Sequence, residues 1–212
     1  MPHIDHPLDI CSLPFDDGAF DVVTSQYGIE YAPADNAFAE AVRVLAGGGE
    51  LGLLMHHEDS EIVVPASIRR REMEALLADD GVLQKLRAVV NGQGTEAELE
   101  AAGQTFIESG VTPTQGISGQ IFQGINSVIE NLRKGERRAG AELCETMLLR
   151  LTADNERLRL LQEAALSQRD FDDIVERLEA AGVKASKACS LCANSGSDDE
   201  FIIGWQYRGK KN

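Results

Sequence analysis

The chain has 212 residues, of which 43% are apolar and 26% are charged, a composition typical of a globular protein with a buried core. The formal net charge of −15 argues against a protein that follows a nucleic-acid backbone, because phosphates repel an acidic surface. No apolar run approaches the ~20 residues that span a bilayer, and residues 1–6 lack the pattern of a signal peptide. We therefore expect a cytoplasmic protein whose partners include neither nucleic acid nor membrane.

Strand and helix signals alternate over residues 1–60. Residues 20–25 form a short run rich in β-branched side chains, which predicts a buried strand. A helix follows with Asp35 as its N-cap, and the glycines at 47–49 are expected to end it. Residues 51–55 predict a second buried strand, so the order is that of a parallel crossover unit. The apolar face of the helix consists of Phe38, Ala41, Val42 and Leu45.

Residues 61–168 are predicted to be mostly helical. Pro65 suits the first turn of a helix, and Thr95 with Glu98 fits a capping box at the start of another. Residues 136–166 form a long stretch rich in Leu and Glu, typical of an extended amphipathic helix. One further helix has an apolar face made of Ile121, Ile125, Val128, Ile129 and Leu132.

The chain ends with a helix and two strand signals. Asp170 is the expected N-cap of the helix, and residues 183–193 predict a strand. A polar loop at 195–199 separates this strand from another at 201–207, which predicts an antiparallel hairpin.

The four cysteines are too few and too scattered for a disulfide framework. Cys189 and Cys192 form a lone C-x-x-C pair without the second pair that a zinc site needs. They lie in a predicted strand rather than at a helix N-terminus, where a redox pair would sit. We interpret them as structural cysteines and expect no metal site.

Several short patterns occur in one order near the N-terminus. They are Asp9 followed by Leu13-Pro14-Phe15, the turn Asp16-Asp17-Gly18, Phe20-Asp21-Val22-Val23, Glu40-Ala41-Val42-Arg43-Val44-Leu45, and Gly47-Gly48-Gly49. Together they resemble the middle of a class I S-adenosylmethionine-dependent methyltransferase, with Gly47 in place of the usual proline. Residues 170–208 resemble the helix, strand and antiparallel strand that close this family's fold.

This resemblance implies the fold class and the domain organisation. The expected fold is α/β, a partial Rossmann-like methyltransferase sheet with a C-terminal antiparallel hairpin and a large helical insertion. Residues 1–60 and 169–212 would form the core, and residues 61–168 the insertion. In the family, insertions at this place often form a lid or a wall for the methyl acceptor; a dimer face is the alternative.

The resemblance also implies a cofactor, S-adenosyl-L-methionine. Asp9 and Ile10 match the family position that contacts the adenine, through a carboxylate and a backbone N–H. Ser25, Gln26 and Tyr27 follow the first predicted strand, where the family lines the methionyl and methyl region. Ligands of open α/β sheets lie beyond the carboxyl ends of strands, which agrees with this placement.

Family members hold this cofactor mainly through a Gly-rich loop and an acidic residue after their first two strands. The resemblance begins near the third strand, so we expect this chain to lack both and to bind the cofactor weakly or not at all by itself. Residues 47–52 match the pattern G-x-G-x-x-G, but they follow a helix and precede a strand. A nucleotide-binding loop requires the reverse order, so this match is rejected.

Polar residues after the same strands are candidates for binding the acceptor. Glu30 and Tyr31 follow the first strand, and His56 and His57 follow the second. One of the histidines suits a general base or an acceptor-orienting role, but adjacent histidines point to opposite faces and so poorly serve one metal. An ordinary polar loop is the alternative. No catalytic residue is assigned, because family catalysis depends mostly on proximity and alignment.

Two functional hypotheses follow. The first is S-adenosylmethionine-dependent methyl transfer to a small-molecule acceptor. The second is a non-catalytic, degenerate methyltransferase-like module that acts in protein association. A homodimer through the helical insertion or through an exposed sheet edge belongs with either hypothesis, because unpaired strand edges invite pairing.

Overall fold

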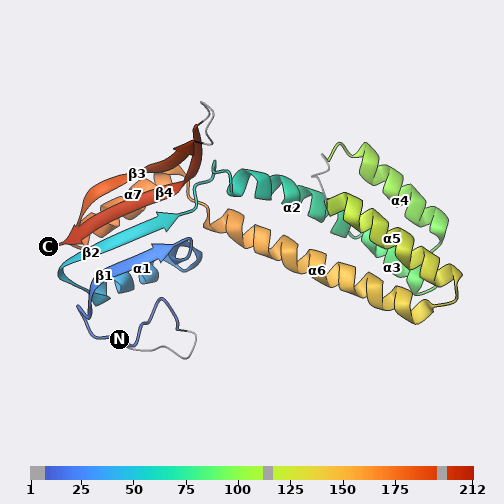
Figure 1. Cartoon of the computed structure of the whole chain (residues 1–212), viewed down its shortest axis with the longest axis horizontal. Helices are drawn as coiled ribbons and strands as arrows, with labels where there is room; N and C mark the ends of the chain where they lie inside the picture. Colours follow the sequence, from blue (N-terminus) through green and yellow to red (C-terminus); the bar gives the residue numbers. More distant parts are fainter. Residues whose placement is uncertain (1–7, 112–116, 195–199) are drawn as a thin grey trace. The chain divides into compact units, whose positions relative to one another are not determined.

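The computed structural model describes residues 8–111, 117–194 and 200–212, so the predicted loop at 195–199 lies outside the described residues. The chain forms two compact units (Figure 1). Met1–Val64 and Leu161–Asn212 make up the first, here called the α/β unit, and Pro65–Leu160 make up the second, the helical unit. In the described parts of the chain, no helix combines the length and apolarity needed to cross a membrane.

The α/β unit contains one four-stranded sheet in the order β1-β2-β4-β3. Its elements are β1 (Phe20–Gln26), the 3₁₀ helix Ile29–Tyr31, α1 (Ala34–Val44), β2 (Leu45–Met55), α7 (Gln168–Ala180), β3 (Val183–Asn194) and β4 (Glu200–Lys211). Strands β1 and β2 are parallel and joined through α1, whereas β4 runs antiparallel to both β2 and β3. The predicted α/β class, the parallel crossover and the C-terminal hairpin are confirmed.

Both helices of the α/β unit pack on one face of the sheet (Figure 1). Their buried apolar residues are Phe38, Ala41, Val42, Phe171, Ile174 and Leu178. The Trp205 ring of β4 stacks on Phe171 at 4.5 Å, which ties α7 to the sheet. The buried Tyr207 hydroxyl donates a hydrogen bond to the Val183 carbonyl at 2.9 Å, and burial raises the pKa of Tyr207 to about 12.

The starts of both helices differ from the sequence predictions. Helix α1 has Pro33 rather than Asp35 as its N-cap. Asp35 lies in the first turn, and its carboxylate pairs with Arg177 of α7. Helix α7 has Ser167 as its N-cap, and Asp170 is the third residue of a capping box. The Ser167 hydroxyl accepts from the Asp170 N–H while the Asp170 carboxylate accepts from the Ser167 N–H, which satisfies two free donors at once.

The glycines at 47–49 do not end α1 as predicted. The helix stops at Val44, and the glycines lie inside β2, where the pairing register with β1 jumps from Leu45 to Glu50. Gly48 has a φ of +78°. A Cβ on Gly49 would lie 2.8 Å from the Asp21 carbonyl oxygen. The glycines therefore let the two strands approach closely through a bulge.

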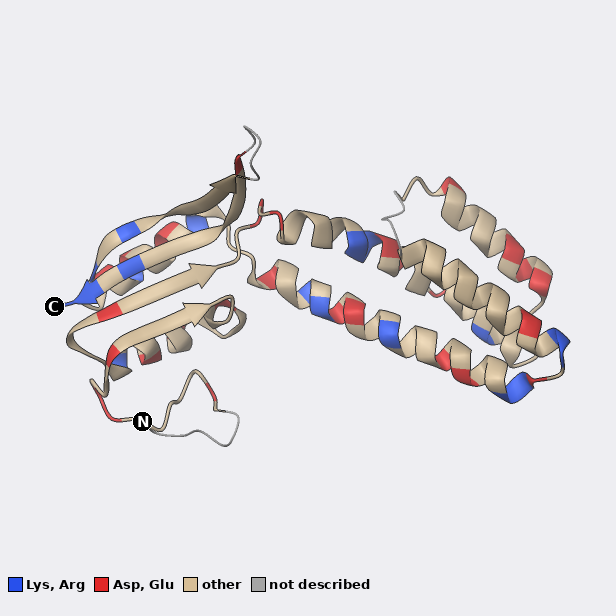
Figure 2. Ribbon diagram, in the orientation of Figure 1, with Lys and Arg blue, Asp and Glu red and all other residues tan. Residues whose placement is uncertain are grey.

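The helical unit is built from helices, as the sequence patterns predict. They are α2 (Val63–Leu77), α3 (Val82–Val90), α4 (Glu96–Glu108), α5 (Ile117–Arg133) and α6 (Arg137–Ala164), with α2 and α6 extending across the unit's bounds. Thr95 and Glu98 form the predicted capping box at the start of α4. Acidic and basic side chains alternate along the surface of α6 (Figure 2), as in the pair Arg138–Glu142 at 2.8 Å.

Candidate functional site at the carboxyl ends of β1 and β2

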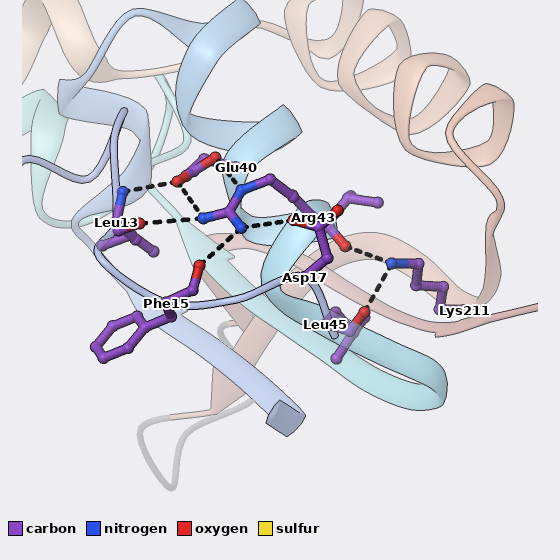
Figure 3. Close-up of polar contacts among 8 residues, drawn as sticks. Leu13, Phe15, Asp17, Glu40, Arg43, Leu45 and Lys211 are labelled. Carbon is purple, nitrogen blue, oxygen red and sulfur yellow. Dashed lines mark hydrogen bonds and ion pairs between the residues drawn. The ribbon is translucent and has the colours of Figure 1, made fainter. Parts of the chain in front are cut away.

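Arg43 of α1 holds the segment that precedes β1 (Figure 3). Its guanidinium donates to the carbonyls of Leu13 at 3.1 Å and Phe15 at 2.7 Å, and to the carboxylates of Asp17 and Glu40, each at 2.7 Å. Glu40 in turn accepts from the Leu13 N–H at 2.6 Å. The hydrogen bonds from Arg43, followed by that from Leu13, lower the pKa of Glu40 to about 2. The E-x-x-R spacing thus fixes the loop that leads into the site.

Lys211 at the end of β4 caps the C-terminal end of α1, the end that also carries Arg43 (Figure 3). Its ammonium donates to the carbonyls of Val42 and Leu45, both at 2.7 Å. These carbonyls belong to the last turn of the helix, where backbone acceptors lack intrahelical partners and a cation is favourable. The sequence does not predict this contact, because no local pattern relates residue 211 to a helix near the N-terminus.

Asp9 and Ile10 lie in a turn at the start of the segment held by Arg43. The Asp9 carboxylate accepts from the Cys11 N–H at 2.9 Å, and its carbonyl accepts from the Ser12 N–H at 3.0 Å. Asp9 is exposed, whereas Ile10 is partly buried and packs against the core. Burial, with a smaller contribution from Asp9, raises the pKa of Cys11. The adenine contact that the sequence predicts for Asp9 and Ile10 stays a prediction.

At the end of β1, the side chains of Ser25 and Gln26 point to opposite faces of the sheet, because successive side chains of a strand alternate between its faces. The Ser25 hydroxyl accepts from the Ile29 N–H at 3.0 Å and so starts the 3₁₀ helix. Gln26 is exposed and pairs in register with Leu54. The two side chains therefore lie on opposite faces of the sheet, and the cofactor contacts that the resemblance implies for them stay predictions.

Tyr27 has a backbone conformation that residues other than glycine rarely adopt. Its φ is +52°, in the left-handed region where residues other than glycine are uncommon. The N–H donates to the Leu54 carbonyl at 2.7 Å and the hydroxyl to the Ile203 carbonyl at 3.2 Å, so both ends of the residue are held. Burial, and then the Glu30 carboxylate, raise the pKa of Tyr27. Such strain is typical of functional sites.

Glu30 and His56 form a buried pair where β1 and β2 end. One carboxylate oxygen, Oε1, lies 2.7 Å from His56 Nδ1 and accepts from the His56 N–H at 3.0 Å. The side chains are 0% and 7% exposed, respectively. The other carboxylate oxygen, Oε2, is buried without a hydrogen-bond partner in the described structure. An unpaired buried acceptor is costly, and its cost needs a functional or structural reason.

Two tyrosine rings flank His56. The ring centroid of Tyr27 lies 4.5 Å from that of His56, and the Tyr31 ring meets it edge-on at 5.7 Å. Tyr31 is 47% exposed, so it connects the buried Glu30–His56 pair to the surface. The structure thus brings together four of the predicted site residues: Tyr27, Glu30, Tyr31 and His56.

His57 lies apart from this group. Its ring stacks on Trp205 at 4.2 Å, and its Nδ1 accepts from the Asp59 N–H at 2.9 Å. The two neighbouring histidines thus diverge, as their sequence positions predict, and the structure places His57 against the core rather than beside Glu30.

Residues 5–53 match the model of a family described as a methyltransferase domain. Over these residues the chain is similar to methyltransferase domains, and we call residues 5–53 the methyltransferase segment. No curated protein matches the chain. The methyltransferase segment includes β1, α1, most of β2 and the Arg43 contacts, as well as Tyr27, Glu30 and Tyr31. The matched segment ends three residues before His56. His56 follows directly after β2, most of which lies in the segment.

Over the described residues, no three His, Cys, Asp or Glu side chains come close enough to hold a metal ion. Cys11, Cys144, Cys189 and Cys192 are free, and the last two lie in β3 as predicted. The side chains that the structure brings together at the site are those of Glu30, His56, Tyr27 and Tyr31.

Proposed function

We propose that this protein takes part in S-adenosylmethionine-dependent methyl transfer to a small-molecule acceptor, which binds beside His56. The observation that carries the proposal is the Glu30–His56 pair, with one nitrogen held at 2.7 Å by a carboxylate. It lies beyond the carboxyl ends of β1 and β2, where open α/β sheets bind their ligands. The match of residues 5–53 to methyltransferase domains supports the reaction class.

The residues near His56 suit the charge of S-adenosylmethionine. The cofactor carries a positive sulfonium and an ammonium group, and when bound it supplies an electrophilic methyl group. Glu30 Oε2 is an acceptor without a partner in the described structure. The faces of Tyr27 and Tyr31 also attract cations. Asp9 offers an exposed carboxylate to an amine donor. We propose that these residues of the chain contact the cofactor.

His56 is placed to accept a proton from the acceptor. A carboxylate only accepts hydrogen bonds, so Glu30 Oε1 keeps the proton of a neutral His56 on Nδ1 and leaves the Nε2 lone pair free. An acceptor O–H or N–H then transfers its proton to Nε2 while its heavy atom becomes the nucleophile. Glu30 stabilises the resulting imidazolium, as the carboxylate does in a catalytic triad. Proximity and alignment supply the remaining acceleration.

The test is methyl transfer by the full chain at millimolar S-adenosylmethionine, which allows for weak binding. Labelled methyl groups are followed onto small phenols, amines and thiols. We expect His56→Gln to lower the rate by about 100-fold or more, the usual contribution of a general base. Glu58→Gln is the matched control, because Glu58 is exposed in the same loop; its rate should stay within about twofold.

Two results would contradict the proposal. An unchanged rate in His56→Gln would remove His56 from proton transfer. No transfer to any acceptor, together with no cofactor binding by calorimetry at millimolar concentration, would remove the enzymatic function. A non-catalytic module acting in protein association would then be favoured, because one face of the sheet in the α/β unit is not covered by a helix of that unit (Figure 1).

A further inference from the structure

The face of the sheet that no helix of the α/β unit covers is basic. Cross-strand register places Lys184, Lys187, Arg208 and Lys210 on one side, opposite to the side that Tyr207 and Val183 present to the helices. All four cations are exposed. The same side carries Val22, which is 59% exposed, and the half-buried Leu54. These six residues define the basic sheet face.

The charge of this face is opposite to that of the unit around it. The α/β unit contains eight Lys and Arg residues against 21 Asp and Glu residues. By cross-strand register, half of its cations lie on the basic sheet face. Figure 2 shows blue bands on β3 and β4, the two strands that carry them. Register places one carboxylate, Glu50, opposite Lys210. The segregation is thus strong enough to give this face its own electrostatic character.

The four cations repel one another in the free chain. Lys184 lies directly opposite Lys210, and Lys187 directly opposite Arg208. Like charges at directly opposed positions destabilise a sheet. Within residues 8–111, 117–194 and 200–212, no carboxylate forms an ion pair with any of the four. An anionic partner would relieve this repulsion.

The shape of the face suits a single helix. Strands about 4.8 Å apart make a sheet of four strands about 14 Å wide, whereas a helix with its side chains is about 10 Å across. A hollow of about 640 Å³ lies over β1, β2 and β4, lined by Leu54, Gln206 and Arg208 among others. Gly52 contributes no side chain there and keeps the floor of the hollow low.

We propose that the basic sheet face binds an acidic amphipathic α-helix of a partner protein. The apolar stripe of that helix covers Val22 and Leu54, and its flanking carboxylates pair with the cations of β3 and β4. A twofold contact with a second copy of the chain would place the four cations of one copy against the four of the other, and these like charges would repel. A nucleic acid would meet the repulsion of the acidic unit around the face. The proposal does not depend on methyl transfer.

The test uses the full chain and a fluorescein-labelled helical peptide about six turns long. The peptide has a leucine stripe flanked by Glu, and a second peptide has Lys at the same positions. Fluorescence anisotropy should show binding of the Glu peptide and none of the Lys peptide. Arg208→Glu combined with Lys210→Glu should weaken binding at least about tenfold, since it reverses two of the four charges.

The control keeps the same change in net charge elsewhere. Lys134→Glu combined with Arg138→Glu alters exposed cations of the helical unit and should leave affinity within about twofold. Lys184→Gln combined with Lys187→Gln, on the edge strand, tests the same face if the first variant fails to fold. Far-ultraviolet circular dichroism checks folding in each case.

Four results would overturn the proposal. They are no binding of the Glu peptide, equal binding of both peptides, equal affinity in the Arg208/Lys210 variant, and a dimer in sedimentation that this variant abolishes. A labelled single-stranded RNA serves as a further probe. Binding of that RNA in preference to the Glu peptide would assign the face to nucleic acid instead.

Discussion

At the scale of single residues, Arg43 and Glu40 link local sequence to the site. The pair spans one helical turn, yet its hydrogen bonds reach Leu13 and Phe15 in a different segment. Neither residue lies beside His56. Their effect on the site is to fix the chain that enters β1, so substitutions here should change stability before they change chemistry.

Glu40 should make stability depend on acidity. Its pKa in the folded chain is about 2, below the value of 4.5 for a free carboxyl. Because the unfolded chain binds the proton more readily, the stabilisation is complete above about pH 5 and is lost as the pH falls towards 2. Urea unfolding at pH 7, 4 and 2.5 should show wild type and Glu40→Gln converging as the pH falls. A difference that stays constant across this range would exclude the pair as the cause.

Glu30 and His56 show what a sequence hides at this scale. Both are expected at an acceptor site because they follow strands, and residue type and position are sufficient for that prediction. Their pairing was not predictable, since 26 residues separate them and only the parallel pairing of β1 with β2 brings them within 2.7 Å. The same holds for Lys211, which reaches α1 across the sheet.

At the scale of elements, the periodicity of apolar residues predicts the buried face of a helix better than local sequence predicts the residue that caps it. Phe38, Ala41 and Val42 are buried as expected. Their spacing places them on one side of a helix, and that side packs against the sheet. Caps are harder, since several residues near a helix start have suitable side chains. Thr95 was identified because Glu98 completes its pattern, whereas Asp170 was mistaken for the cap that Ser167 provides.

The cap of α7 gives a graded prediction. Ser167→Ala should destabilise the protein by about 1 kcal/mol, because the Asp170 N–H loses its acceptor. Ser167→Gly should cost only a few tenths of a kcal/mol, since glycine exposes the free N–H to water. Thermal unfolding followed by circular dichroism at 222 nm would measure both. Equal losses for the two variants would point to Ser167 packing rather than to capping.

At the scale of the whole molecule, the helical unit interrupts a chain whose two parts are hydrogen-bonded to each other. The Leu166 N–H donates to the His56 carbonyl at 2.9 Å, and the Glu58 N–H donates to the Leu166 carbonyl at 3.2 Å. The chain thus leaves the α/β unit and re-enters it at points that lie next to each other. The resemblance to the methyltransferase family implies that residues far apart share one sheet, but it contains no information on this junction.

This junction predicts that the α/β unit folds without the helical unit. Residues 65–160 would be replaced by a flexible Gly-Ser linker of about eight residues. Closing the shorter loop costs about 0.6 kcal/mol less for each halving of its length, which offsets part of any stabilisation lost with the insertion. The expected product unfolds cooperatively and keeps the fluorescence of Trp205 buried against Phe171. A non-cooperative transition with solvent-exposed Trp205 would show instead that the helical unit is required for the sheet to form.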